Sequence, residues 1–341
     1  MIKYTKILNS FKRCHVLVIG DLILDQYIKG SVDRISPEAP VPILLQRDMF
    51  YTPGGAANVA NNLSSLGAKV TVVGRIGNDR EGHQLKELLK ERRIRTVGIF
   101  EDRRVHTILK TRIIAHQQQL VRVDRELVVD DSDGSFYAKS IAPFLHKNFN
   151  DFDAVIISDY GKGIIQPELV EDVTTMAGKR GIPVVVDPKV EHLKFYGHVS
   201  SITPNRKEAE NAMKSLEPHT RKDFGILKTR LDSMETVKKS GVGLLNYLGI
   251  DSLLITLGED GMCLFEQGKQ PLHIPTRAHE VFDVSGAGDT VISVFALAMA
   301  AGAKKKEAAD IANHAAGIVV AKIGAASVTP EELVSSFKEE R

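Results

Sequence analysis

The residues best suited to chemistry lie late in the chain, at 283–290, Asp-Val-Ser-Gly-Ala-Gly-Asp-Thr. Gly286, Ala287 and Gly288 are small enough for consecutive backbone N–H groups to point into one concavity. The apolar run 291–301 is typical of a helix, whose N-terminus adds partial positive charge at that point. The pattern predicts a nest for the negative charge that builds on a phosphoryl group during transfer.

Asp289 falls in the first turn of this expected helix, beside the anion nest. From these eight residues alone, two interpretations stay open. The carboxylate caps the helix, or it takes a proton from an attacking hydroxyl group.

A first strand is expected at 15–20, His-Val-Leu-Val-Ile-Gly, because a short continuous apolar run fits a buried parallel strand. Asp21 and Asp25 follow it, and open α/β sheets bind their ligands at the carboxyl ends of strands. These carboxylates either accept hydrogen bonds from sugar hydroxyls or serve as a helix cap and a solvated acid.

Paired glycines, Gly54 and Gly55, precede a second expected helix and permit a backbone approach that side chains would block. Asn58 lies one turn into that helix and should face the same ligand. A glycine pair alone is a weak signal, because many helices begin after a glycine turn.

The second half of the chain alternates strand-like and helix-like segments. Apolar runs at 154–158, 183–186, 201–204 and 252–257 each end in polar or glycine residues. This alternation predicts an α/β fold with a doubly wound, mostly parallel sheet flanked by helices. We expect one domain over 1–341.

Two segments depart from this alternation. Residues 28–51 carry prolines that exclude a helix, and residues 103–123 contain alternating polar and apolar side chains. We expect these excursions to form a small β-stranded lid over the site.

Composition and missing motifs narrow the class of protein. A net charge of +2 gives no sign of nucleic-acid or membrane binding, and no export signal or bilayer-spanning run is present, which predicts a cytoplasmic protein. Cys14 and Cys263 share no metal-ligand spacing and are expected to be buried, reduced thiols. The sequence lacks the P-loop, the early Gly-x-Gly-x-x-Gly and the zinc motifs. What remains fits phosphoryl transfer from a nucleotide to a small hydroxylated substrate.

The chain resembles the ribokinase-like (PfkB) sugar kinases over almost its whole length. Residues 54–58 are similar to the family's N-terminal signature, 283–290 to its C-terminal signature, and 205–208, Asn-Arg-Lys-Glu, to its Asn-x-x-Glu element. All three occur in order and at the expected separations. The resemblance implies a carbohydrate kinase that uses ATP and Mg²⁺.

The resemblance also implies roles for individual residues. Asp289 would be the catalytic base, with 286–288 as the anion hole, and Glu208 and Asn205 would organise Mg²⁺ largely through water. A monovalent cation such as K⁺ in the loop of Asp283 stays open, since several relatives hold one. The sugar would be bound by Asp21, Asp25, Gly54, Gly55 and Asn58, and ATP by Asn205, Arg206, Lys207, Glu208, Thr256, Gly258, Gly261 and Asn313.

Within this family, 20–27, 30–42, 158–163 and 187–189 are similar to the D-glycero-β-D-manno-heptose 7-phosphate kinases. Those enzymes phosphorylate the anomeric hydroxyl to give the 1,7-bisphosphate, a precursor of ADP-heptose for lipopolysaccharide. Many carry a C-terminal nucleotidyltransferase domain. This chain resembles the stand-alone form, which implies a separate nucleotidyltransferase in the same pathway.

The phosphate of such a substrate needs cationic partners. Lys162 and Lys189, with Asp159, lie at expected strand ends in family-like motifs and are the preferred candidates. The assignment of either lysine to the sugar phosphate or to the transferring phosphate stays open. Arginines flanking the second lid segment are weaker candidates, namely Arg104, Arg112, Arg122 and Arg125.

Exposed strand edges in a lid commonly pair, so we expect a homodimer through the lids. Three rivals stay open: a kinase for another sugar or sugar phosphate, a sugar-binding regulator without turnover, and, more distantly, a nicotinamide oxidoreductase. The retained Asp289 argues against the regulator, because a binding protein needs no base.

Overall fold

The computed structural model describes residues 2–116, 118–126, 134–278, 280–322, 324 and 326–338. Within these ranges nine strands form one central sheet, in the order β13-β12-β11-β10-β9-β8-β1-β4-β5. Neighbours from β11 to β5 pair in parallel, and β12 and β13 add an antiparallel edge. The predicted mostly parallel α/β sheet is confirmed. Its strands are β1 (His15–Gly20), β4 (Lys69–Gly77), β5 (Arg95–Asp102), β8 (Ala154–Ser158), β9 (Val184–Asp187), β10 (Ser201–Ile202), β11 (Ser252–Thr256), β12 (Met262–Glu266) and β13 (Leu272–Ile274).

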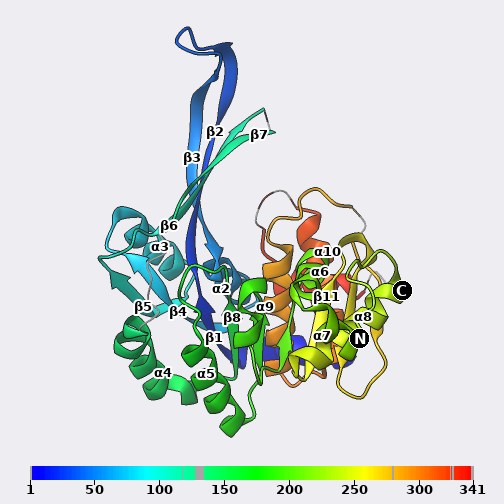
Figure 1. The fold of residues 1–341 in the computed structure, drawn as a ribbon. Helices are drawn as coiled ribbons and strands as arrows, with labels where there is room; N and C mark the ends of the chain where they lie inside the picture. The colour runs from blue at the N-terminus through cyan, green and yellow to red at the C-terminus, as the bar shows by residue number, and fades with distance from the viewer. Residues whose placement is uncertain are drawn as a thin grey trace.

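Helices cover both faces of this sheet (Figure 1). Strand β1 shows how: Val16 and Val18 join one apolar cluster, while Leu17 and Ile19 join the other. Successive side chains of a strand point to opposite faces, so a strand buried on both sides is apolar throughout. The first cluster takes residues from α1 (Ile2–Ser10), α2 (Ala56–Ser65), α3 (Arg80–Glu91), α9 (Ala287–Ala300), α10 (Lys305–Val320) and α11 (Pro330–Ser336), and the second from α4 (Ala142–Asn148), α5 (Pro167–Arg180), α6 (Arg206–Ser215) and α8 (Met234–Leu248).

The remaining helical segments are short. They connect the longer elements and lie mostly at the ends of strands or helices. Among the described residues they are α7 (Pro218–Asp223), η1 (Phe11–Arg13), η2 (Tyr137–Ile141), η3 (Phe149–Asp151), η4 (Val190–Phe195) and η5 (Gly258–Asp260).

Strand order changes direction beside β1. The chain places β4 and β5 on one side of β1, and later returns to place β8 to β11 on the other. Ligands of open α/β sheets bind at such a switch point, outside the carboxyl ends of the strands. Asp21 follows β1 and Asp159 follows β8, so the loops after these strands meet there.

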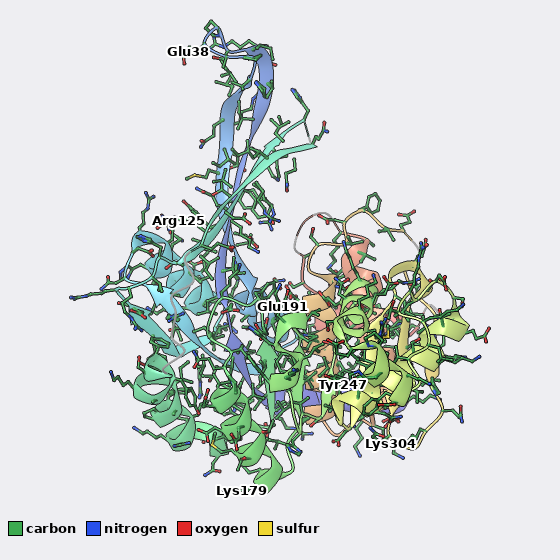
Figure 2. The ribbon with its side chains drawn as sticks, in the orientation of Figure 1. Glu38, Arg125, Lys179, Glu191, Tyr247 and Lys304 are labelled. Atoms are coloured by element: carbon green, nitrogen blue, oxygen red, sulfur yellow. The ribbon has the colours of Figure 1, made fainter. Side chains whose placement is uncertain are left out.

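A second sheet of four strands within the described ranges forms the lid, in the order β3-β2-β6-β7. It projects from the core as a long blade, with Glu38 at its tip and Arg125 near its base (Figures 1 and 2). We expected lid excursions at 28–51 and 103–123. The first pair of strands begins closer to the core than expected, because β2 leaves β1 almost directly and Leu22 pairs with Gly55. The second pair lies close to the expected range. The lid strands are β2 (Leu22–Ile35), β3 (Pro42–Gly55), β6 (Ile108–Ala115) and β7 (Gln118–Arg125).

Two further expectations concerned the state of the cysteines and the presence of a bilayer-spanning segment. Cys14 and Cys263 are buried and free, and burial raises the pKa of the first to about 11 and of the second to about 12. They therefore stay protonated and inert near neutral pH. Among the described residues, no helix is both long enough and apolar enough to span a bilayer.

Candidate active site

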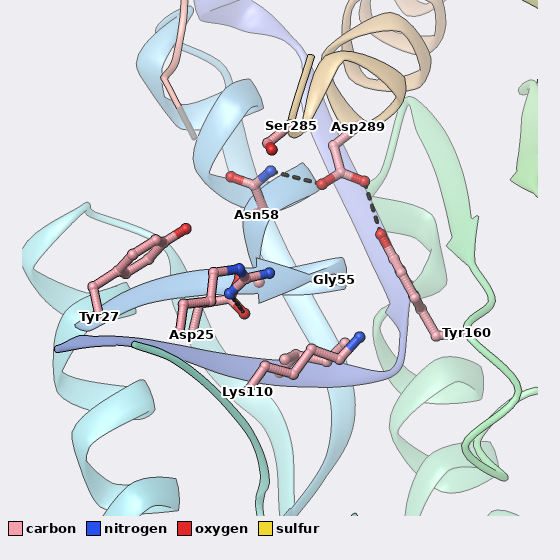
Figure 3. A pocket seen from close by; sticks show the side chains of 12 residues that line it. Asp25, Tyr27, Gly55, Asn58, Lys110, Tyr160, Ser285 and Asp289 are labelled. Atoms are coloured by element: carbon pink, nitrogen blue, oxygen red, sulfur yellow. Dashed lines mark hydrogen bonds and ion pairs between the residues drawn. The ribbon is translucent and has the colours of Figure 1, made fainter. Parts of the chain in front are cut away.

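A cavity of about 250 Å³ lies where the base of the lid meets the N-terminus of α9 (Figure 3). Its walls come from β2, β3, β6, α2, the loop after β8 and the loop before α9. Six of its residues were predicted from the sequence: Asp25, Gly54, Gly55, Asn58, Gly286 and Asp289. A seventh, Arg112, was a weaker candidate, and the remaining five are Ile23, Tyr27, Lys110, Tyr160 and Ser285.

Asp289 faces this cavity from the first turn of α9. The helix begins after Gly286, whose φ of 79° suits a residue without a side chain. Asn58 Nδ2 donates a hydrogen bond of 2.6 Å to Asp289 Oδ2, and the Tyr160 hydroxyl donates one of 3.1 Å to Oδ1. The carboxylate is therefore held by side chains of α2 and of the loop after β8. These bonds differ from those of a helix cap, which accepts from backbone N–H groups of its own helix.

The environment of Asp289 shifts its titration toward neutral pH. Burial raises the pKa of the carboxyl group to about 6, although the hydrogen bonds from Asn58 and Tyr160 act in the opposite direction. A base works best when its pKa lies near the operating pH. The carboxylate can therefore be ionised and ready to accept a proton near neutral pH.

Glycine and asparagine bring the chain close to this carboxylate from the lid side. A Cβ atom added at Gly54 would lie 2.4 Å from Asp25 Oδ2, so any other residue here would displace the Asp25 carboxylate. The next residues turn into α2, and Asn58 in its first turns reaches Asp289. The early glycine pair and the late octapeptide therefore meet in one cavity, 231 residues apart in the chain.

Two cations from the lid complete the cavity wall. Lys110 and Arg112 alternate on β6 and both line the cavity. Arg112 donates to Asp25 Oδ1 at 2.6 Å, and Lys110 Nζ lies 5.7 Å from the centre of the Tyr160 ring. Sequence reasoning included Arg112 as a weaker candidate and missed Lys110. The alternation of the second lid segment was the signal that would have found it, since i and i+2 share a face of a strand.

Asp21 serves the backbone of a loop and does not line the cavity. Its Oδ2 accepts hydrogen bonds from the N–H groups of Tyr160 at 2.9 Å and Lys162 at 3.0 Å. Burial, with the nearby charge of Asp159, raises the pKa of Asp21 to about 6, although those backbone donors act to lower it. This carboxylate therefore fixes the loop that carries Tyr160.

Asp159 also points away from the cavity. Its Oδ2 accepts from the hydroxyl of Tyr196 at 2.7 Å and lies 2.7 Å from His192 Nδ1, and its Oδ1 accepts from the N–H of Gly161 at 2.7 Å. The side chain is fully buried. It ties the loop after β8 to the segment after β9.

The two lysines preferred from the sequence lie outside the cavity wall. Lys162 Nζ is 2.7 Å from Glu126 Oε1, and Lys189 Nζ is 3.5 Å from Glu191 Oε2. The structure brings Lys110 and Arg112, and not these two, to the cavity.

Asn205 and Glu208 cap α6 reciprocally. The Asn205 N–H donates to Glu208 Oε2 at 2.8 Å, and the Glu208 N–H donates to Asn205 Oδ1 at 3.0 Å. Burial raises the pKa of Glu208. These oxygens suit Mg²⁺, which keeps several waters and needs few protein ligands. Among the described residues, no group of three or more His, Cys, Asp or Glu is placed to hold a metal directly.

Arg206 and Lys207 differ in their surroundings. Arg206 donates to the carbonyl oxygens of Leu231 at 2.9 Å and Leu257 at 3.1 Å, and it pairs with Asp260. Arg206 thus braces the loop after β11, whereas Lys207 is exposed.

The remaining nucleotide candidates gather around the end of β11. Thr256 forms an isolated parallel β-bridge with Asn205. The turn that follows begins at Gly258 and ends at Gly261. Asn313 of α10 is buried, and its Nδ2 donates to the carbonyl oxygen of Pro275 at 2.6 Å.

Backbone donors order the loop of Asp283, where the question of a monovalent cation was left open. Asp283 accepts from the N–H of Ser285 at 2.8 Å and from that of Gly324 at 3.1 Å. Burial acts to raise the pKa of Asp283, but these hydrogen bonds outweigh it and hold the pKa below its ordinary value.

Comparison with known families agrees with this geometry. Residues 14–332 match the model of the pfkB family carbohydrate kinases. The chain belongs to this family. The prediction of a carbohydrate kinase is confirmed.

Relatives with curated names narrow the resemblance. The chain is 41% identical over 332 residues to "Bifunctional protein HldE" of Desulfatibacillum aliphaticivorans, and 42% identical over 332 residues to the protein of that name from Pelobacter propionicus. Each alignment covers 97% of this chain but only 65% and 64% of those proteins. The chain therefore spans slightly less than two thirds of these relatives.

Solved structures share the fold. A ribokinase of Arabidopsis thaliana complexed with ribose and ATP aligns with a TM-score of 0.70 at 20% identity, covering 95% of this chain and 99% of that one. Phosphofructokinase-2 of Escherichia coli in complex with potassium aligns with a TM-score of 0.73 at 18% identity, covering 96% and 99%. The ribokinase-like fold is confirmed.

Proposed function

We propose that this kinase transfers the γ-phosphoryl group of ATP to the anomeric hydroxyl of D-glycero-β-D-manno-heptose 7-phosphate, giving the 1,7-bisphosphate. One observation carries the proposal: a sugar-sized cavity has a buried carboxylate at a helix N-terminus on one side and two cations on the other. The similarity to bifunctional HldE proteins supports the same substrate and a place in ADP-heptose supply for lipopolysaccharide.

In this proposal Asp289 acts as the general base. It takes the proton of the C1 hydroxyl while that oxygen attacks the γ-phosphorus. The new bond is O1–P, the bond that breaks joins the γ-phosphorus to the β,γ-bridging oxygen, and ADP leaves. Backbone N–H groups at 286–288, where α9 begins, stabilise the charge on the transferring group.

Lys110 and Arg112 would bind the substrate's existing phosphate. Arginine can bind phosphate through two parallel N–H donors, and lysine acts as a point charge. Arg112 already pairs with Asp25 Oδ1, so a bound sugar phosphate would share this cation with Asp25. The other carboxylate oxygen of Asp25 would accept hydrogen bonds from sugar hydroxyls. The lid thus supplies the phosphate contacts and the core supplies the base.

Mg-ATP would lie on the side of α6 and β11. Asn205 and Glu208 would hold Mg²⁺ through water, and the bound ion would neutralise charge on the triphosphate. Thr256, Gly258, Gly261 and Asn313 would flank the nucleotide. The loop of Asp283 stays the candidate for K⁺.

The position of the new phosphate tests the proposal. The protein is incubated with Mg-ATP and the heptose 7-phosphate, and the product is examined by ³¹P NMR. The proposal expects a second phosphorus resonance coupled to the anomeric proton. A phosphate on another carbon, or no product, would overturn it.

We also propose that two copies pair through the lid. A row of apolar side chains crosses all four strands on the face opposite the cavity: Met49, Ile28, Ile113 and Val121 are successive cross-strand neighbours. Met49 is 42% exposed and Val121 48%, which is costly for a lone sheet in water.

Light scattering at micromolar protein tests the pairing. The wild type should be a dimer, and Val121→Lys should give monomers. Val97→Lys provides the matched control, because Val97 is 71% exposed on β5, outside the lid. A monomeric wild type would contradict the proposal.

The expectation of a separate nucleotidyltransferase stays a prediction.

A further inference from the structure

Tyr160 is the point at which the catalytic carboxylate, the lid and an anchored loop meet. Its hydroxyl donates to Asp289 Oδ1 at 3.1 Å, on the opposite side of the carboxylate from Asn58, which donates to Oδ2 at 2.6 Å (Figure 3). Each carboxylate oxygen thus has one side-chain donor. Two donors on different oxygens fix the plane of the carboxylate, and each oxygen keeps a lone pair for another partner.

The backbone that carries Tyr160 is held from two directions. Asp21 is 1% exposed and accepts from the N–H groups of Tyr160 and Lys162. Asp159, the residue before Tyr160, accepts a hydrogen bond from the buried hydroxyl of Tyr196. Two buried carboxylates therefore fix the backbone of this loop through their hydrogen bonds. The loop in turn places the phenol of Tyr160 in the cavity wall.

The face of the Tyr160 ring contacts the lid. Lys110 Nζ lies 5.7 Å from the ring centre, within the range of a cation–π interaction. The same side chain therefore contacts a cation proposed to bind the substrate and the carboxylate proposed to take its proton.

We propose that Tyr160 is a positioning residue for Asp289: its hydroxyl fixes the carboxylate with the free lone pairs toward the acceptor hydroxyl and favours the ionised form. This inference rests on the proposed function of Asp289 as general base. It gives the buried acids Asp21 and Asp159 a common purpose, which is to hold the loop that places the phenol.

The charge balance around the carboxylate agrees with this role. The negative charge of Asp289, followed by burial, raises the pKa of Tyr160 well above its usual range, so the phenol stays a donor. Hydrogen bonds from Asn58 and Tyr160, and the charge of Lys110, act to lower the pKa of Asp289, against burial and Asp25. The groups that face Asp289 are Asn58 from α2, Asp25 from β2, Lys110 from β6, Tyr160 from the loop after β8 and Asp187 from β9.

The test is the pH dependence of kcat/KM for Tyr160→Phe. This variant removes the hydroxyl but keeps the ring and the N–H that Asp21 binds. The wild-type acid limb should lie near pH 6, the pKa of Asp289. Losing one hydrogen bond to the charged form should move the limb upward by about one pH unit, which lowers kcat/KM about fivefold at pH 6 and about tenfold well below it.

Tyr27→Phe is the matched control, because Tyr27 lines the same cavity, but the side chains hydrogen-bonded to Asp289 in Figure 3 are those of Asn58 and Tyr160. It should leave the acid limb in place, whatever it does to KM. A limb of Tyr160→Phe that coincides with the wild-type limb would overturn the inference. Should Tyr160→Phe not fold, Tyr160→Met carries the same prediction.

Asp289→Asn separates the two claims. If this variant keeps near-wild-type turnover, the proposed base is wrong, and with it the proposed function. If Asp289→Asn loses turnover while Tyr160→Phe shows an unmoved limb, the base is upheld and only the role of Tyr160 fails.

Discussion

Asp289 and Asp21 are both buried carboxylic acids near the carboxyl edge of the sheet, and burial raises the pKa of each to about 6. They differ in their partners. Asp289 is held by two side chains and opens onto the cavity, whereas Asp21 is held by backbone N–H groups of the loop after β8 and lies outside the cavity wall.

With Asp289 as the proposed base, the comparison indicates that partners, and not burial alone, distinguish a chemical acid from a structural one. At Asp21 the backbone donors occupy the carboxylate and fix the path of the loop. At Asp289 the side-chain donors orient the carboxylate, which lines the cavity. A perturbed pKa at a strand end is therefore a reason to examine a residue, and its partners together with its place in or outside the cavity bear on its role.

The largest effect should follow from Asp289→Asn. The variant should fold and bind Mg-ATP, but its turnover should fall by about 10²–10⁴-fold, the usual scale for a lost general base. ADP release with the heptose 7-phosphate is the measurement. Asp21→Asn should lose far less, because the base stays in place. Equal losses in the two variants would contradict the distinction drawn between them.

A smaller effect is expected on the lid side. Lys110→Met should raise KM for the sugar phosphate about 10–100-fold, the value of one charge-assisted contact, with a smaller effect on the unphosphorylated sugar. Arg122→Met is the control, because Arg122 pairs with Asp124 on β7 outside the cavity wall. Initial rates over a range of sugar concentrations measure both variants. Equal effects of Lys110→Met on the two sugars would exclude a phosphate contact.

The smallest effect concerns stability. The folded-state pKa of Asp289, about 6, lies above the value near 4 of an unfolded carboxyl group. The ionised form therefore destabilises the fold, fully above pH 6 and not at all below about pH 4. Asp289→Asn should increase the free energy of unfolding at pH 8 by on the order of 2 kcal/mol, with the gain vanishing toward pH 4. Thermal unfolding at the two pH values measures this, and a less stable variant at pH 8 would contradict it.

The parallel sheet could be predicted from the sequence, because apolar runs that end in glycine or an acid are a local pattern. The helix that begins after Gly286 also follows from a local pattern, three small residues before an apolar run. The anion nest at 286–288 stays a prediction. Asn58 was expected to face the ligand, but its hydrogen bond to Asp289, 231 residues further along the chain, was not predicted.

The rest depends on where long-range neighbours lie. Asp21 and Asp159 stand at strand ends like ligand-binding acids, but the backbone of the 159–163 loop and Tyr196 take up their oxygens. The register of β2 against β6 brings Lys110 opposite Asp25, and no local pattern sets that register. Local patterns therefore favoured the lysines at strand ends, whereas the cations that line the cavity are Lys110 and Arg112 of the lid.

The most direct measurement of the central claim is ADP release by the wild-type protein with Mg-ATP. D-glycero-D-manno-heptose 7-phosphate is compared with unphosphorylated heptose, fructose 6-phosphate and ribose. We predict a strong preference for the heptose 7-phosphate in kcat/KM. A preference for another sugar, or equal rates with and without the 7-phosphate, would contradict it.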